Sequence, residues 1–368
     1  MKHTLGIKRA ARVKTVAGQS FLAFAALTAL GADAPRRPAP EAVERRVALM
    51  GTKVDVAILA PRREDALKAS EDVLAELSRV ETLLTTWRPG GPLARLDESP
   101  VGAALAVDAE LLSVLTEVFA WAARTGRAFD PTVLPLIKAW GLRSGGRTPS
   151  AEELSKALSA TGTDRFLLDS RAGTAARLDS RAGIEEGAWG KGYALDRAAA
   201  RLRETRVAGA LIDLGGQVLA RGRPGDGASW TIAISHPEAR ERPVLTLSLS
   251  DVSASTSGNS ERRREVQGRG IGHVLDPRTG QPARDFGSVT VVAPSALTAD
   301  VLSTALFVLG PEEGLALSAR LRREGFAQEA LYLVEREGAL DALASPGFAR
   351  LILATDPAAV RGLKTIPD

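Results

Sequence analysis

Residues 190–216 read GKGYALDRAAARLRETRVAGALIDLGG, and no other segment of the chain says more about the fold. The apolar spacing predicts a helix over residues 190–202 and then a strand over residues 208–213 that ends at Gly215-Gly216. No helix opens after those glycines, so the fingerprint of a dinucleotide-binding βαβ unit is absent. Lys191 is followed by glycine rather than Ser or Thr, and the segment is therefore not a P-loop.

Helices and strands are mixed irregularly on either side of this stretch. Helices are predicted over residues 63–84, 108–125 and 297–309, with further helices starting after Pro149 and Pro311. Strands are predicted over residues 54–59, 231–235, 244–249, 273–275, 288–293, 330–334 and 350–353. Because strict βαβ alternation is missing, we predict an α+β fold with mixed sheets and flanking helices rather than a doubly wound sheet.

The composition argues for a soluble globular protein and against a nucleic-acid partner. Apolar residues make up 45% of the 368 residues and charged residues 25%. The 48 basic side chains are nearly balanced by 44 acidic ones, and aromatic residues are only 4%. No basic stripe is interleaved with the stacking aromatics that single-stranded nucleic acids require.

The chain has no cysteine and only three histidines, His3, His236 and His273. Thiolate nucleophiles, disulfides, Cys-ligated zinc and iron–sulfur clusters are thereby excluded, and a multi-histidine metal site is not feasible. Any bound metal should be a hard cation held by oxygen ligands.

Residues 1–34 are predicted to be a signal peptide. Basic residues from Lys8 to Lys14 precede an apolar run from Phe21 to Leu30, and Ala32-Asp33-Ala34 offers a cleavage site. We expect an exported, periplasmic protein, although an uncleaved inner-membrane anchor or a cytoplasmic leader stays open. A lipoprotein is excluded because there is no cysteine. Residues 35–46 (PRRPAPEAVERR) are predicted to be a linker, and residues 47–368 a single folded domain.

Three features carry candidate chemistry. Glycines gather at residues 187–192, 215–216, 257–258 and 268–272, where close backbone approach suits a nucleotide, although each segment alone also fits a tight turn. Asp300 and Thr304 are one helical turn apart, with Ser303 beside them. Their side-chain oxygens could bind magnesium, or the aspartate and threonine could simply belong to the beginning of an ordinary helix. Residues 273–280 (HVLDPRTG) combine an imidazole, a carboxylate and a guanidinium, or form a structural turn with a capping aspartate.

Together these segments resemble the ApbE family of FAD:protein FMN transferases. The matching segments follow the family's order through nearly all of residues 50–310: residues 50–52, 85–87, 129–132 with 140–141, 190–196, 213–216, 256–258, 273–280 and 299–305. The resemblance implies mixed sheets with flanking helices around a flavin-nucleotide cleft. Two positions depart from the family pattern, because Glu185 stands where aspartate is common and Ser260 where tyrosine is frequent.

The resemblance also implies roles for individual residues. The FAD site would be lined by Met50, Trp87, Ala128, Phe129, Asp130, Glu185, Lys191 and Val274. Magnesium would be held by the backbone carbonyl of Ala188 with Asp300, Thr304 and Ser303, and His273 is the candidate for assisting proton removal.

The implied reaction is phosphoryl transfer. A threonine hydroxyl on a partner flavoprotein, a membrane or periplasmic electron-transfer subunit, would attack the FMN-side phosphorus of FAD, and AMP would leave. Two alternatives stay open at this stage. One is a magnesium-dependent FAD pyrophosphatase, in which water replaces threonine, and the other is an FAD-binding accessory protein without turnover.

Overall fold

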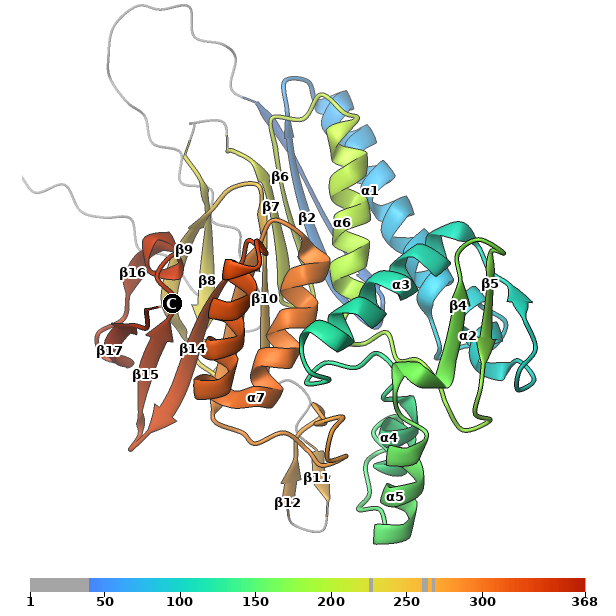
Figure 1. Ribbon diagram of the computed structural model, residues 1–368. Coiled ribbons are helices and arrows are strands. Elements are labelled where there is room, and N and C mark those ends of the chain that lie inside the picture. The colour runs from blue at the N-terminus through green and yellow to red at the C-terminus, as the bar shows by residue number, and fades with distance from the viewer. Residues whose placement is uncertain (1–39, 225–227, 260–263, 267–268, 368) are drawn as a thin grey trace, which may run out of the picture.

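A large antiparallel sheet organises the molecule (Figure 1). The computed structural model describes residues 40–224, 228–259, 264–266 and 269–367. In that part of the chain the sheet has the strand order β1-β2-β6-β7-β10-β13-β14-β15-β17, and only β15 and β17 are parallel neighbours. Its strands are β1 (Glu41–Leu49), β2 (Thr52–Ala60), β6 (Gly209–Leu214), β7 (Gln217–Gly222), β10 (Val252–Gly258), β13 (Gly287–Ala293), β14 (Glu329–Arg336), β15 (Ala339–Ala344) and β17 (Val360–Thr365).

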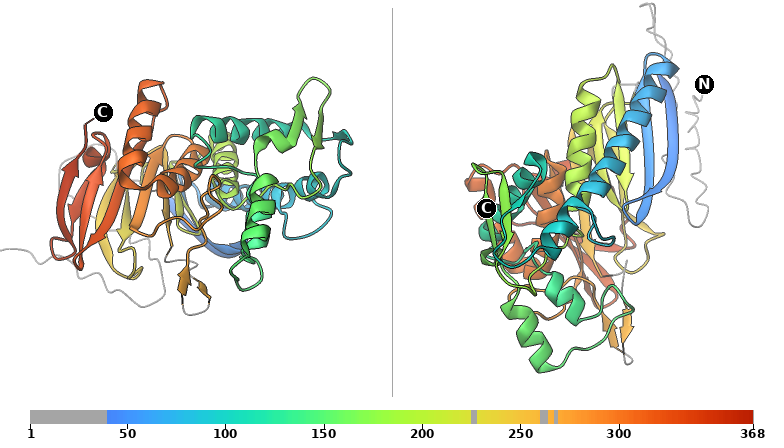
Figure 2. Two further views of the ribbon diagram at one scale, coloured as in Figure 1. Left: turned by 60° about the horizontal axis from the view of Figure 1, so that its bottom comes forward. Right: turned by 90° about the vertical axis from the view of Figure 1, so that its right-hand side faces the viewer.

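The sheet is buried on both faces. Helices α1 (Arg63–Leu84), α6 (Gly190–Arg203) and α7 (Ala296–Arg323) cover one face (Figures 1 and 2). A small sheet covers the other face, with the strand order β16 (Ile352–Thr355), β9 (Pro243–Leu249) and β8 (Trp230–Ser235). Side chains alternate accordingly along β2, since Val54, Val56 and Ile58 face the helices while Ala57 and Leu59 face the small sheet. This double burial explains the uninterrupted apolar run over residues 54–59.

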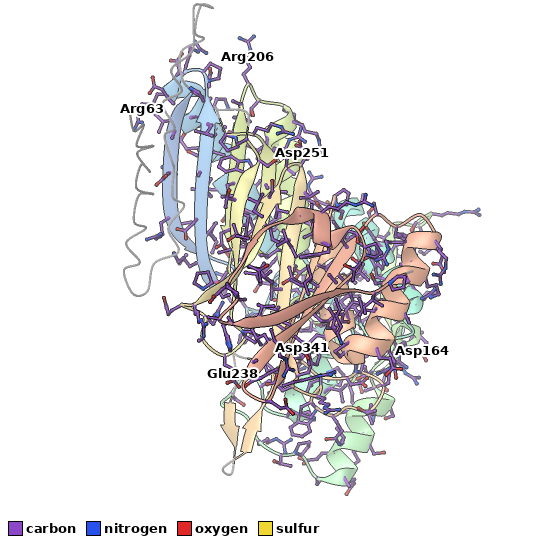
Figure 3. All side chains as sticks on the ribbon, turned by 90° about the vertical axis from the view of Figure 1, so that its left-hand side faces the viewer. Arg63, Asp164, Arg206, Glu238, Asp251 and Asp341 are labelled. Atoms are coloured by element: carbon purple, nitrogen blue, oxygen red, sulfur yellow. The ribbon has the colours of Figure 1, made fainter. Side chains whose placement is uncertain are left out.

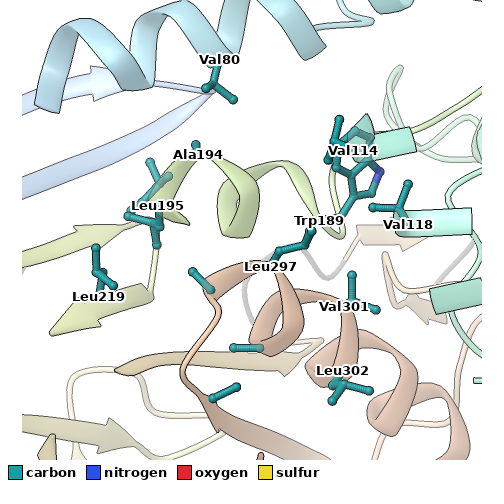
Figure 4. Close-up of a cluster of buried hydrophobic side chains, with 14 of the residues drawn as sticks. Val80, Val114, Val118, Trp189, Ala194, Leu195, Leu219, Leu297, Val301 and Leu302 are labelled. Carbon is teal, nitrogen blue, oxygen red and sulfur yellow. The ribbon is translucent and has the colours of Figure 1, made fainter. Parts of the chain in front are cut away.

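The helix-side core joins α1, α6 and α7 with α3 (Ala109–Arg124). Figure 4 shows Val80 of α1, Ala194 of α6 and Val301 of α7 in the same buried cluster, together with Trp189 from the loop before α6. This packing fixes the start of α6 against the start of α7, which is where the sequence places the candidate metal ligands.

The remaining elements lie beside this central body (Figure 2). They are α2 (Pro92–Glu98), β3 (Leu105–Ala106), α4 (Leu134–Ala139), α5 (Ala151–Ser159), the 3₁₀ helix η1 (Thr163–Arg165), β4 (Phe166–Asp169), β5 (Thr174–Arg177), β11 (Arg264–Val266), β12 (Arg269–Ile271) and the 3₁₀ helix η2 (Phe348–Leu351). Mixed sheets with flanking helices confirm the predicted α+β class.

Helix boundaries follow the sequence signals closely. α1 spans the predicted residues 63–84. The Asp108 side chain caps α3 by accepting from the Glu110 amide at 2.8 Å, as its position before the apolar pattern indicated. α7 is interrupted at Gly310 (φ 75°, ψ 178°), immediately before Pro311, so the prediction of two consecutive helices there is confirmed.

The predicted linker is wrong over residues 41–46, because these residues form most of strand β1. Val43 pairs with Ile58 and is only 5% exposed. Arg45 reaches across to α1, where its Nε donates to the Ser70 hydroxyl at 2.7 Å and its guanidinium pairs with Glu71 at 3.0 Å. An edge strand that presents charges to solvent lacks the apolar signal of a central strand. The predicted signal peptide and residues 35–39 lie outside the described residues.

Two predicted strands are also corrected. Residues 273–275 form no strand, and only Leu275 makes a single bridge, to Pro282. The chain there enters a tight turn after Asp276 that interrupts pairing. At residues 350–353 the first two residues belong to η2, and β16 begins at Ile352.

By length and composition, α7 is the one described helix that could cross a membrane, yet 56% of its most apolar window is buried inside the fold. It therefore packs here as a core helix.

Charged side chains such as Arg206, Asp251 and Glu238 lie at the surface (Figure 3). Acidic and basic groups are both exposed, in keeping with the near balance of charge in the sequence.

Candidate active site

The site begins where the N-terminus of α6 meets that of α7. A Cβ built on Gly192 would lie 2.4 Å from the Ala296 carbonyl oxygen and 2.7 Å from the Leu297 Cα, so only glycine allows this approach. The two helix starts are thereby held in backbone contact. The glycine-rich segment at residues 190–192 therefore opens a helix, whereas Gly215-Gly216 forms the β6–β7 hairpin turn with positive φ at both residues.

Asp300 lies at the centre of this junction. Its carboxylate accepts a hydrogen bond of 2.9 Å from the Gly192 amide. The ammonium of Lys191 stands 3.2 Å from Asp300 Oδ1, and the Asp300 side chain is only 4% exposed. A buried carboxylate without partners would be costly, so the amide and the ammonium together make its burial possible.

Hydroxyl groups surround the same carboxylate. Strand β10 brings Ser255 and Ser257 to the α7 side of the sheet, since alternate residues share a face. The Ser255 hydroxyl lies 3.4 Å from Asp300 Oδ1 and 3.1 Å from the Ser303 hydroxyl, while Ser257 donates to Ser303 at 2.9 Å. Ser303 in turn donates to the Asp300 carbonyl at 2.9 Å and is fully buried.

The donor set fits a hard cation. Asp300 offers a carboxylate, half-buried Thr304 lies one turn further along α7, and the Ala188 carbonyl belongs to the loop before α6. Among the described residues there is no group of three or more His, Asp or Glu side chains that could hold a metal. Oxygen donors with a single carboxylate match magnesium, which commonly completes its shell with water and substrate phosphates.

An aromatic and cationic pair flanks this loop on the side of α1. Trp87, which follows the end of α1, is 57% exposed, and the guanidinium of Arg143 lies 4.5 Å from the centre of its ring. Arg143 donates to the Thr86 hydroxyl at 2.6 Å and pairs with the Glu185 carboxylate. Glu186 accepts from the Thr86 hydroxyl at 2.6 Å. These contacts tie Trp87 to the loop that carries Ala188.

Glu185 sits in an unusual electrostatic setting. Burial and the neighbouring charge of Glu186 raise the pKa of Glu185 to about 7, and Arg143 offsets part of that effect. Asp97 of α2 accepts from the Ile184 amide with both oxygens, at 3.0 and 3.1 Å. Burial raises the pKa of Asp97 to about 7 as well. The loop before α6 is therefore anchored by two carboxyl groups that titrate near neutral pH.

The segment 128–130 is linked to this loop through the next residue, since the Pro131 carbonyl accepts from the Glu185 amide at 2.7 Å. Ala128 and Phe129 are 0% and 1% exposed and belong to the main core, so only their backbone can face a ligand. The Asp130 carboxylate accepts from the Thr132 amide at 2.9 Å and from Arg127 at 3.0 Å. The structure thus assigns the Asp130 side chain to holding its own turn.

Met50 lies in the turn between β1 and β2, and Val274 lies in the segment before the turn at residues 276–280. Met50 takes a positive φ of 52° in the two-residue turn between β1 and β2. It lines a shallow hollow with Glu81 of α1, and Arg88, next to Trp87, lies 3.7 Å from Glu81. Val274 is half-buried against the main core, and its carbonyl accepts from the Ala283 amide at 2.9 Å.

His273 is half-buried and precedes the turn at residues 276–280. Asp276 accepts from the Arg278 amide at 2.9 Å and pairs with its guanidinium at 2.9 Å, which holds that turn together. The Gly280 carbonyl accepts from the Trp140 indole at 2.7 Å and so docks the turn on α4. Of the two interpretations of this motif, the structural turn with a capping aspartate is the one that Asp276 and Arg278 adopt. Ser260 lies outside the described residues.

Several site residues were missed by the sequence analysis. Ser255 had a usable signal, since the serines at 253, 255 and 257 alternate at the period of a strand. Arg143 and Asp97 had none, because their partners lie far away in the sequence.

Solved structures define the class of the protein. The crystal structure of the Pseudomonas stutzeri flavinyl transferase ApbE in its apo form matches with a TM-score of 0.75 and 29% identity, covering 86% of this chain and 99% of that one. The flavin transferase ApbE from Vibrio cholerae matches with a TM-score of 0.74 and 26% identity, covering 85% and 99%. The fold is therefore that of the flavin transferases.

Sequence comparison gives the family. The ApbE family model matches residues 50–327. A FAD:protein FMN transferase of Klebsiella pneumoniae (strain 342) is 31% identical over 316 residues, which cover 83% of this chain and 88% of the relative. One of Escherichia coli (strain K12) is 29% identical over 328 residues, covering 86% and 92%. The chain belongs to the ApbE family, which confirms the resemblance and the enzyme class that its motifs implied.

Proposed function

We propose that the protein transfers FMN from FAD to a threonine side chain of a partner flavoprotein and releases AMP. The buried Asp300, held between Lys191 and the Gly192 amide, is the observation that carries this proposal. A carboxylate there could hold a cation that in turn binds the pyrophosphate of FAD. The names of the relatives, FAD:protein FMN transferase, support the same reaction.

The chain's own residues would act by position and charge. Trp87 has Arg143 on its ring and remains 57% exposed, which suits stacking on the flat flavin of the substrate. The threonine hydroxyl would bond to the FMN-side phosphorus while the bond from that phosphorus to the AMP oxygen breaks. His273 would accept the hydroxyl proton, and Lys191 would face the phosphate charge.

Magnesium is part of the proposal. Asp300 and Thr304, with the Ala188 carbonyl, would hold it, whereas the Ser303 hydroxyl is already bonded to Ser255, Ser257 and the Asp300 carbonyl. When bound, the ion would offset negative charge on the pyrophosphate. Positioning and electrostatics would then supply most of the rate acceleration.

The proposed location follows from the first 34 residues. We propose export to the periplasm, where the acceptor would be a membrane or periplasmic electron-transfer subunit bearing the threonine. The basic and apolar segments before Ala34 support this.

Intact-mass spectrometry tests the proposal directly. A threonine-bearing acceptor domain is incubated with the protein, FAD and Mg²⁺, and a parallel sample contains EDTA. We expect a metal-dependent gain of one FMN mass together with AMP. AMP without the mass gain would instead identify a pyrophosphatase, and retained FAD with neither product would identify a binding protein.

A further inference from the structure

The ammonium of Lys191 lies close to three oxygen atoms. Its Nζ lies 3.2 Å and 3.5 Å from the two Asp300 carboxylate oxygens and 3.4 Å from the Gly187 carbonyl oxygen. Carboxylate and carbonyl oxygens are also the donors that magnesium takes. The Lys191 ammonium therefore pairs with Asp300, the same carboxylate that is proposed to bind magnesium.

The ion pair between Lys191 and Asp300 has an electrostatic reason. Asp300 is 4% exposed, and a carboxylate buried to that degree needs a compensating charge. In the part of the chain that the structure describes, Lys191 is the cation found in an ion pair with it. A divalent ion bound to the same carboxylate would repel an ammonium a few ångströms away.

Lys191 is also able to move. Lys191 lies in the first turn of α6, and 26% of its side chain is exposed. The four-carbon stem carries a point charge rather than a rigid fork, so it can change partners at low cost. Movement away from Asp300 would leave the ammonium available to an anionic group.

We propose that Lys191 is a tethered counter-ion that neutralises Asp300 in the metal-free protein and moves to the substrate pyrophosphate when magnesium binds. The inference rests on the proposed function for the identity of the metal and the substrate. It makes two predictions of opposite sign. Removing the ammonium should strengthen magnesium binding to the FAD-free protein and weaken FAD binding to the magnesium-loaded protein.

Isothermal titration with Mg²⁺ alone tests the first prediction. We compare the wild-type protein with K191M and K191Q near pH 7.5, at fixed ionic strength and without FAD. K68M is the matched control, because Lys68 pairs with Asp72 at 2.7 Å on the exposed face of α1. We expect the magnesium Kd to fall about tenfold or more in both Lys191 variants and to stay unchanged in K68M, tenfold being about 1.4 kcal/mol.

Thermal unfolding gives a second readout. Without Mg²⁺, K191M should unfold at a lower temperature than the wild type, because Asp300 loses its counter-ion. Saturating Mg²⁺ should remove most of that difference. If K191M fails to fold, K191Q carries both measurements.

An unchanged or weaker magnesium affinity in the Lys191 variants overturns the inference, as does a failure of every form to bind Mg²⁺. The FAD Kd of the magnesium-loaded variants is read from quenching of flavin fluorescence, and an unchanged value would also count against it. The proposed function is judged separately, from FMN transfer by the wild type with and without EDTA. A transferase with unaltered magnesium binding in K191M would keep the function and lose this inference.

Discussion

The carboxylate of Asp196 accepts a hydrogen bond of 2.7 Å from the Ala296 amide, and so joins the middle of α6 to the start of α7. The same carboxylate accepts from the Ser295 hydroxyl at 2.7 Å and from the Leu297 amide at 3.0 Å. A helix N-terminus normally finds its cap in its own chain segment. Here Ser295 supplies such a local cap by accepting from the Thr298 amide at 3.2 Å, and Asp196 of a second helix adds further acceptors, which set the register that brings Asp300 to Gly192.

Replacing Asp196 should therefore damage both stability and the site. We expect D196A to lower the free energy of unfolding by about 1–2 kcal/mol and to weaken FAD binding. Urea denaturation and fluorescence titration measure the two effects. D108A is the control, because Asp108 is an exposed cap on α3 that accepts from the Glu110 amide. A D196A protein that binds FAD like D108A would show that the inter-helix cap does not position the site.

The contact at Gly192 leads to a second prediction. G192A should cost about 1–3 kcal/mol or more, because a Cβ would collide with the backbone of residues 296–297, which cannot swing away. G362A is the matched control, since nothing lies within 4 Å of a Cβ at that position. Chemical denaturation compares the two variants. Equal stability of G192A and the wild type would mean that the helix starts are not in the close contact seen here.

The sequence was most informative where a signal is local. The ends of α1 were predictable because an apolar helical pattern is cut off by Pro89-Gly90-Gly91, and the break in α7 followed from Pro311. Asp300 and Thr304 became candidates because their spacing matches one helical turn, although the same spacing also fits an ordinary helix start. The family resemblance then joined such segments into one site.

The contacts that bring these segments together were not predictable. Arg143 meets Thr86 and Glu185 across 57 and 42 residues, and no local pattern marks such a pairing. β1 was hidden for a related reason, since four of its nine side chains are charged and only pairing with β2 makes it a strand. Local periodicity reports burial, whereas these features depend on tertiary partners.

Arg143 should position the Trp87 ring. R143M removes the cation over the ring and the links to Thr86 and Glu185, so we expect FAD affinity to fall roughly threefold to tenfold. The tryptophan emission of the ligand-free protein should also change. R147M is the control, because Arg147 lies on the same α4–α5 connection but pairs with exposed Glu153. Identical FAD affinity in R143M and R147M would contradict this role.

The raised pKa of Glu185 predicts a pH dependence of stability. Because the folded-state pKa, about 7, lies above the usual value of 4.5, the folded protein binds more protons between those pH values. The contribution of Glu185 to stability therefore falls as the pH rises through this window. E185Q should flatten the slope of unfolding free energy between pH 5 and pH 8, with Asp97 supplying part of what remains.

E153Q is the control for that measurement. Arg147 and the Ser150 amide lower the pKa of Glu153 to about 2, so this carboxylate stays charged throughout the window. Its replacement should shift the whole curve without changing the slope. A slope in E185Q that equals the wild-type slope would show that Glu185 is ionised in the folded protein at acidic pH.

Substitutions at Asp300, Thr304 and Ser303 should show which of these side chains serve FMN transfer and which serve stability. D300A should lose at least about two orders of magnitude in FMN transfer, because the α6–α7 junction loses the buried carboxylate that is proposed to hold the metal. T304V should also lose transfer while keeping its stability, since half-buried Thr304 is proposed to hold the metal. S303A should keep FMN transfer and lose stability, because the buried Ser303 hydroxyl is hydrogen-bonded to Ser255, Ser257 and the Asp300 carbonyl. Transfer rates and urea midpoints of the three variants decide the assignment, and a stable S303A that transfers no FMN would move Ser303 into the metal site.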